Sequence, residues 1–127
     1  MTKREKIELA ITNFVRGGDN SDVDLLENVL HANFRVTSND FMGTSGITII
    51  SKEQYIANIR EGIFGGLPRE MKIESIDDFE TIAHVKLSLE SAENYFISYN
   101  SLVLDTDNQW KLISNLAVVK SKNSILN

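Results

Sequence analysis

Two runs decide the fold of this chain, residues 95–104 (YFISYNSLVL) and residues 110–119 (WKLISNLAVV). Each run alternates with the period of two that is typical of a β-strand, yet apolar side chains occupy both of its faces. A sheet that is apolar on one face needs one covering layer, whereas a sheet that is apolar on both faces needs two. Because one layer of helices leaves the second face uncovered, the pattern predicts self-association through that face.

The composition indicates a globular protein with one domain, residues 1–127. Apolar residues make up 42% of the chain and charged residues 24%, and a chain of this length buries about two thirds of its unfolded surface. The net charge of -5, with Lys and Arg scattered, argues against nucleic-acid binding. Cysteine is absent, residues 1–8 are polar, and no apolar run approaches the roughly 20 residues of a membrane span. We therefore predict a cytoplasmic protein with no nucleic-acid or membrane partner.

The first half of the chain has helical periodicity. Apolar residues recur at the spacing of one helix face, namely Ile7, Ala10, Ile11, Phe14 and Val15. We expect Gly17-Gly18 to stop this helix. Ser21 is the expected N-cap of a second helix that ends near His31. Ser51 begins a capping-box pattern, which predicts a third helix that continues to Gly65-Gly66.

The second half has the period of a β-strand. Four long strands are expected, at residues 71–77, 81–89, 95–104 and 109–120. Their short connections predict an antiparallel meander. Two shorter strands are expected at residues 34–38 and 47–50, with a glycine-containing loop at 43–46 between them. Helices followed by a long antiparallel sheet form an α+β pattern, with the helices on one side.

Two segments resemble a known family. Residues 10–31 (AITNFVRGGDNSDVDLLENVLH) are similar to the opening of the nuclear transport factor 2-like superfamily, in particular of its "putative lumazine-binding" and SnoaL-like branches. Residues 107–113 (DNQWKLI) resemble that group's turn, tryptophan and apolar strand. The resemblance implies a cystatin-like roll, in which a curved sheet packs on three helices of the N-terminal half and forms a cone with a ligand pocket at its mouth. It implies little about activity, because this scaffold hosts several enzyme classes, transport adaptors and binding proteins.

The strand phase of that family implies which side chains line the cone. The predicted ligand-binding residues are Phe14, Phe34, Val36, Ser38, Ile59, Phe64, Phe96, Ser98, Asn100, Ser114 and Leu116. Further residues expected to point inward are Val85, Leu87, Leu89, Leu102, Leu112 and Val118. Such a wall is mainly apolar with a few polar groups, which suits a mainly hydrophobic small molecule. The alternative is that these side chains fill a closed core.

The resemblance also allows a test for isomerase chemistry. Ketosteroid isomerase, a member of this superfamily, uses a carboxylate base and an oxyanion hole made by a tyrosine and a protonated aspartate. The resemblance places Phe14 at the tyrosine, Ser38 at the base and Asn100 at the aspartate. None of the three can take a proton from carbon near neutral pH. We therefore expect no isomerase activity and assign no catalytic residue.

Other acid–base chemistry would need His31 or Asp40. His31 is expected at the end of the second helix, where the dipole favours a cation, and Asp40 is expected near the mouth. His84 falls on the polar outer face of its strand, and Asp77-Asp78 is interpreted as a turn. The sequence contains no metal-ligand spacing and no nucleotide fingerprint, so we predict no metal and no cofactor.

The outer face of the two decisive strands carries the residues through which we predict a homodimer. These are Tyr95, Ile97, Tyr99, Val103, Ile113, Ala117 and Val119. Exposed together, they would form a larger apolar patch than a monomer usually tolerates. We expect a twofold dimer built sheet against sheet.

Three function classes remain open. The first is a binding protein for an apolar small molecule, without catalysis. The second is a cyclase- or dehydratase-type enzyme that uses His31 or Asp40. The third is a dimeric association module with a closed core. Convergence of Ser38, Asn100 and Ser114 on an open cavity would favour the first class.

Overall fold

The computed structural model describes residues 1–41 and 45–123, so Gly43 and Thr44 of the expected glycine loop lie outside the described residues. The elements are, in order, α1 (Lys3–Asp19), α2 (Val23–Val29), β1 (Leu30–Asn39), β2 (Ile47–Ser51), α3 (Lys52–Arg60), β3 (Glu70–Phe79), β4 (Ile82–Glu90), β5 (Asn94–Leu104) and β6 (Trp110–Ser121). Helices in the first half and long strands in the second confirm the predicted α+β class.

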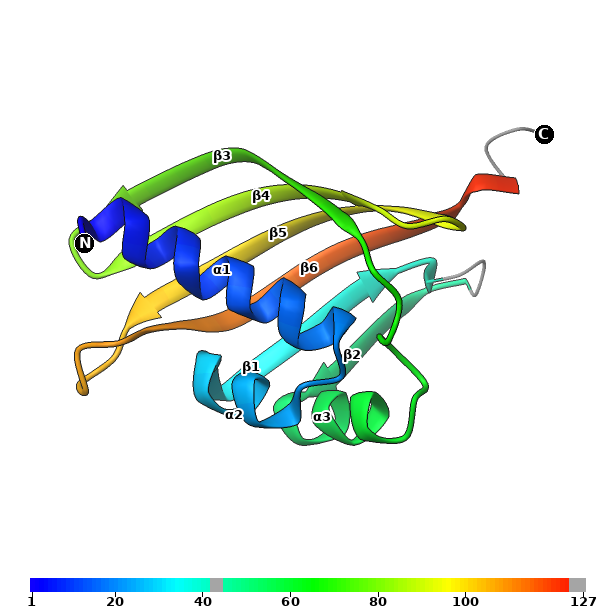
Figure 1. Cartoon of the computed structure of the whole chain (residues 1–127), viewed down its shortest axis with the longest axis horizontal. Coiled ribbons are helices and arrows are strands. Elements are labelled where there is room, and N and C mark those ends of the chain that lie inside the picture. Colours follow the sequence, from blue (N-terminus) through cyan, green and yellow to red (C-terminus); the bar gives the residue numbers. More distant parts are fainter. Residues whose placement is uncertain (42–44, 124–127) are drawn as a thin grey trace.

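In the described part of the chain the strands form one six-stranded sheet in the order β2-β1-β6-β5-β4-β3. The meander β3 to β6 is antiparallel as predicted, and β1 joins β6 in parallel. Figure 1 shows a curved sheet with the helices on one face: α1 lies across the long strands, while α2 and α3 lie near β1 and β2. This is the curved, helix-covered sheet that the resemblance implied.

The core lies between α1 and the sheet. Ile7, Ile11 and Val15 of α1 are almost wholly buried, as are Leu87 of β4 and Leu112 of β6. Their burial removes apolar surface from water on the helix-covered face alone. Among the described residues, no helix has both the length and the apolar composition needed to cross a membrane. The cytoplasmic location stays a prediction.

Two helix boundaries differ from expectation. Gly17 and Gly18 do not stop α1, which continues to Asp19. Gly17 lies against α2, where an added Cβ would lie 2.8 Å from Leu26 Cγ, so the glycine serves close helix packing. The N-cap of α2 is Asp22, whose side chain accepts from the Leu25 amide, and not Ser21.

The third helix begins where it was predicted and ends early. Ser51 is the N-cap of α3, and its hydroxyl accepts from the Gln54 amide at 3.2 Å. The helix ends at Arg60, and Gly62 with a φ of 77° follows it. Residues 61–69 then form a connection that returns to the end of α1.

A β-bulge in β6 reverses part of the predicted strand phase. Leu112 pairs with Leu102 and Ser114 pairs with Ser101, so Ile113 is an extra residue in β6. After the bulge, Ala117 and Val119 face the helices, which corrects their predicted outward position. Residues predicted to point inward lie on the outer face instead: Ser114, Leu116 and Val118.

The turn expected at Asp77-Asp78 is also displaced. Both residues belong to β3, which continues to Phe79, and the chain turns at Glu80, whose φ is 50°. Asp78 instead forms an ion pair of 2.8 Å with Lys3 of α1. A short polar residue is therefore an uncertain turn signal when a strand can accommodate it.

Candidate functional site

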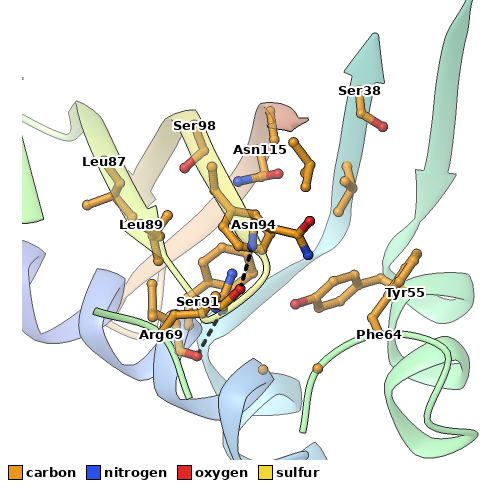
Figure 2. Close-up of a pocket in the computed structure, with 18 of the residues that line it drawn as sticks. Ser38, Tyr55, Phe64, Arg69, Leu87, Leu89, Ser91, Asn94, Ser98 and Asn115 are labelled. Atoms are coloured by element: carbon orange, nitrogen blue, oxygen red, sulfur yellow. Dashed lines mark hydrogen bonds between the residues drawn. The ribbon is translucent and has the colours of Figure 1, made fainter. Parts of the chain in front are cut away.

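A cavity of about 390 Å³ lies between the helices and the sheet. Residues from α1, β1, α3, β4, β5, β6 and the connection 61–69 line it. Figure 2 shows Ser38, Ser98 and Asn115 toward one end of the cavity, and Tyr55, Arg69 and Ser91 toward the other. Asn94 and apolar side chains line the rest of the cavity.

Aromatic rings form one side of the cavity. The ring centroid of Tyr55 lies 6.0 Å from that of Phe14 and 6.1 Å from that of Phe64, and Phe64 lies 6.0 Å from Phe41. Phe34 packs behind Phe14 and Tyr55 at 5.8 and 5.9 Å and is fully buried. Such tilted and edge contacts pack the rings against one another and make this side of the cavity apolar.

Amides and a hydroxyl form the polar end beneath Asn115. The side chain of Asn115 donates to Asn100 Oδ1 at 2.6 Å, and Asn100 donates to Ser98 Oγ at 3.1 Å and to the Val85 carbonyl at 3.3 Å. Asn100 is fully buried. Its hydrogen bonds fix Asn115 and Ser98, which face the cavity, because a buried amide without partners would be costly.

Charged groups lie at the other end. Arg69 Nε donates to Asp19 Oδ1 at 2.6 Å, and Arg16 donates to Asp19 Oδ2 at 2.9 Å. Arg69 also lies 5.1 Å above the ring of Phe96. The Asp19 side chain is 3% exposed, so its charge depends on both arginines. This cluster joins the end of α1 to the start of β3.

Tyr55 connects the aromatic side to the charged end. Its hydroxyl points across the cavity in Figure 2, and burial raises its pKa to about 12, with smaller opposing effects of Arg69 and Asp19. The hydroxyl is therefore protonated near neutral pH and can donate a hydrogen bond.

A family model described as "Putative lumazine-binding" matches residues 2–116. This chain belongs to that family. The match confirms the predicted membership of the nuclear transport factor 2-like superfamily and of its lumazine-binding branch. No curated protein matches this member of the family.

Solved structures show the same fold. An NTF2-like protein from Cytophaga hutchinsonii has a TM-score of 0.81 at 21% identity, with 94% of this chain and 100% of that chain covered. An NTF2-like protein of unknown function from Shewanella baltica has a TM-score of 0.80 at 15% identity, covering 94% and 98%. A ketosteroid isomerase-like protein from Erwinia carotovora atroseptica has a TM-score of 0.71 at 9% identity, covering 89% and 92%. At these identities the likeness establishes the fold alone.

Most of the predicted ligand-binding residues line the cavity of this family member. Those that line it are Phe14, Val36, Ser38, Ile59, Phe64, Phe96 and Ser98. Phe34 and Asn100 lie behind the cavity wall, and Ser114 and Leu116 lie on the outer face. The convergence of Ser38, Asn100 and Ser114 that would favour a binding role is not observed, because Ser38 alone of the three lines the cavity. That the seven lining residues bind a ligand stays a prediction.

The sequence did not reveal five polar lining residues: Tyr55, Arg69, Ser91, Asn94 and Asn115. Tyr55 precedes Ile59 by four residues on α3, so the helical period could have placed both on one face. Asn115 was missed because of the bulge at Ile113. Arg69 lies in a connection without helical or strand periodicity, and its partner Asp19 lies 50 residues earlier. No local sequence pattern therefore indicates that Arg69 lines the cavity.

The candidate acid–base residues lie elsewhere in this family member. His31 is in β1, two residues past the last residue of α2, and its Nδ1 accepts from the Asn33 amide at 3.0 Å. Asp40 accepts from the Gly46 amide at 3.2 Å. His84 is on the outer face, stacked on Tyr99. Among the described residues, none of these three lines the cavity, and no group of three or more His, Asp or Glu is placed to hold a metal ion.

Proposed function

We propose that this chain binds a small, mainly apolar molecule in the cavity between its helices and sheet, without catalysis. The observation that carries the proposal is the pairing of a packed aromatic side with two polar ends. A cavity of this size and kind is typical of small-molecule sites, where apolar contacts supply affinity and a few polar groups fix orientation.

The chemistry of the wall supports binding over catalysis. The lining residues within 1–41 and 45–123 include no His, Asp or Glu, which are the side chains most often used as general acids and bases. A cyclase- or dehydratase-type reaction through His31 or Asp40 would require one of them to reach the cavity. The family description makes lumazine, a flat bicyclic heterocycle, a sensible first ligand to test.

Adjacent residues on opposite faces of β6 provide a matched experiment. Ala117 lines the cavity, whereas Val118 is on the outer face. Ala117→Leu should fill part of the cavity and weaken binding of lumazine or the neutral probe 2-naphthamide by about tenfold or more, whereas Val118→Leu should leave binding unchanged. Isothermal titration calorimetry measures both. Equal affinity of the two variants would contradict a site in the cavity, and no binding of either compound would favour the closed-core association module.

We also propose that two copies pair through the outer face of the sheet. The outer apolar patch consists of Ile97, Tyr99, Leu116 and Val118, each 40–49% exposed. Tyr99 is paired with Leu116 and Ile97 with Val118, so these side chains are neighbours on one face. An exposed apolar surface of this kind suits a twofold contact with a second copy. The bulge replaces Ala117 and Val119 of the predicted dimer surface with Leu116 and Val118.

A further inference from the structure

Two hydrogen-bond donors that line the cavity lie close to Gly18. A Cβ added to Gly18 would lie 3.3 Å from Arg69 Nη2 and 3.4 Å from the Tyr55 hydroxyl oxygen. Both groups therefore approach the position that a side chain of residue 18 would take. Figure 2 shows Tyr55 and Arg69 reaching this end of the cavity from opposite sides.

Tyr55 contributes a donor without a partner in the described part of the chain. No described residue hydrogen-bonds to its hydroxyl, and the effects on its titration are burial and the charges of Arg69 and Asp19. The hydroxyl is accessible from the cavity, because no fully buried side-chain polar atom in the described residues lacks a partner. It is therefore free to donate to a ligand atom that accepts a hydrogen bond.

Arg69 contributes an excess of positive charge. Asp19 is paired with two guanidinium groups, those of Arg69 and Arg16, which leaves one positive charge uncompensated in the cluster. Arg69 Nη2 reaches the Val15 carbonyl only at 3.3 Å. Among the described residues that line the cavity, Arg69 alone is charged. An anion beside Gly18 would therefore meet an attractive charge with no carboxylate in the cavity wall.

We propose that this end of the cavity binds the carboxylate of an apolar carboxylic acid, between the Tyr55 hydroxyl and Arg69, beside Gly18. The inference rests on the proposed function, because the apolar body of the acid occupies the aromatic part of the same cavity. One carboxylate oxygen accepts from Tyr55 and the group's charge balances the arginine cluster. Glycine at residue 18 favours this arrangement, since an added Cβ would crowd Arg69 Nη2 and the Tyr55 hydroxyl at 3.3 and 3.4 Å and displace them from the carboxylate.

A matched pair of probes tests this assignment. 2-Naphthoate and 2-naphthamide share an aromatic body and differ in charge, and calorimetry at neutral pH gives the affinity of each. The unaltered protein should bind the acid at least about tenfold more tightly than the amide. Gly18→Ala and Tyr55→Phe should each reduce this preference to about threefold or less. Tyr95→Phe, on the outer face, is the control and should leave it unchanged.

The outcomes separate this inference from the proposed function. If the unaltered protein binds both probes equally well, the carboxylate subsite is wrong while the cavity remains a binding site. If the acid is preferred but neither Gly18→Ala nor Tyr55→Phe changes the preference, the acid binds elsewhere and the subsite is again wrong. If neither probe binds at millimolar concentration, the proposed function fails and the subsite fails with it.

Discussion

Burial raises the pKa of Tyr55, and this shift has a consequence for stability. The folded-state value of about 12 exceeds the ordinary value of 10.0. The unfolded chain therefore loses this proton first, so the contribution of Tyr55 to stability is complete below about pH 10 and is lost as pH rises toward about 12. The full loss is about 3 kcal/mol.

Replacement of Tyr55 by Phe should remove that part of the alkaline loss of stability. Urea denaturation at several pH values between about 9 and 12 gives the difference between the two proteins. Near neutral pH the variant should unfold with a free energy within about 1 kcal/mol of the original, because the hydroxyl lacks a partner. Tyr95→Phe serves as the control. An identical alkaline profile for Tyr55→Phe and the original protein would contradict the burial of this hydroxyl.

At the residue scale, the sequence predicts apolar lining residues better than polar ones. Phe14, Val36 and Phe96 were placed correctly because burial repeats with the period of their element. Arg69 was not placed, because its position depends on Asp19 at the end of α1. A polar side chain in a cavity is held by partners distant in sequence, and a single sequence does not reveal such partners.

The contact between α1 and α2 depends on the small size of Gly17. An added Cβ would lie 2.8 Å from both Leu26 Cγ and Cδ2, and Leu26 is fully buried. Gly17→Ala should therefore lower the free energy of unfolding by about 1–3 kcal/mol through overpacking. Gly18→Ala is the matched control: its Cβ meets the ends of two long side chains, and helix propensity favours alanine by up to about 1 kcal/mol.

Urea denaturation midpoints of the two variants provide the measurement. We expect Gly17→Ala to unfold at a lower urea concentration than the original protein, and Gly18→Ala at the same or a higher one. Equal destabilisation by both substitutions would mean that α1 needs glycine for its backbone, as the sequence first suggested, and not for packing.

The strands show where periodicity succeeds and where it fails. Residues 82–90 and 94–104 keep the predicted phase throughout, because neither strand contains an inserted residue. In β6 one extra residue at Ile113 exchanges the faces of all that follow. A bulge leaves no mark in an apolar run, so the sequence gives the strand but not the reversal within it.

At the scale of the whole molecule, the outer apolar patch extends across the sheet. Leu116 is paired with Tyr99 of β5 on one side and with Thr37 of β1 on the other. Thr37 is in turn paired with Ile49 of β2. Light scattering should therefore report about twice the mass of the 14.3 kDa chain. Leu116→Glu should weaken the pair by about tenfold or more, because it places a charge in a dry contact.

Ile63→Glu is the control for the dimer, since Ile63 is exposed on the helix-covered side, in the connection after α3. It should leave the mass unchanged. A monomer at micromolar concentration, or equal effects of the two substitutions, would contradict pairing through the sheet.

The central claim is that the cavity holds a small molecule. Native mass spectrometry of the protein purified from its natural source tests it most directly, because the method weighs each chain together with whatever it retains. We expect the 14.3 kDa chain to carry an additional small-molecule mass, which gentle activation releases and which Ala117→Leu reduces. A bare chain mass under the gentlest conditions, together with no binding of lumazine, 2-naphthamide or 2-naphthoate, would contradict the account.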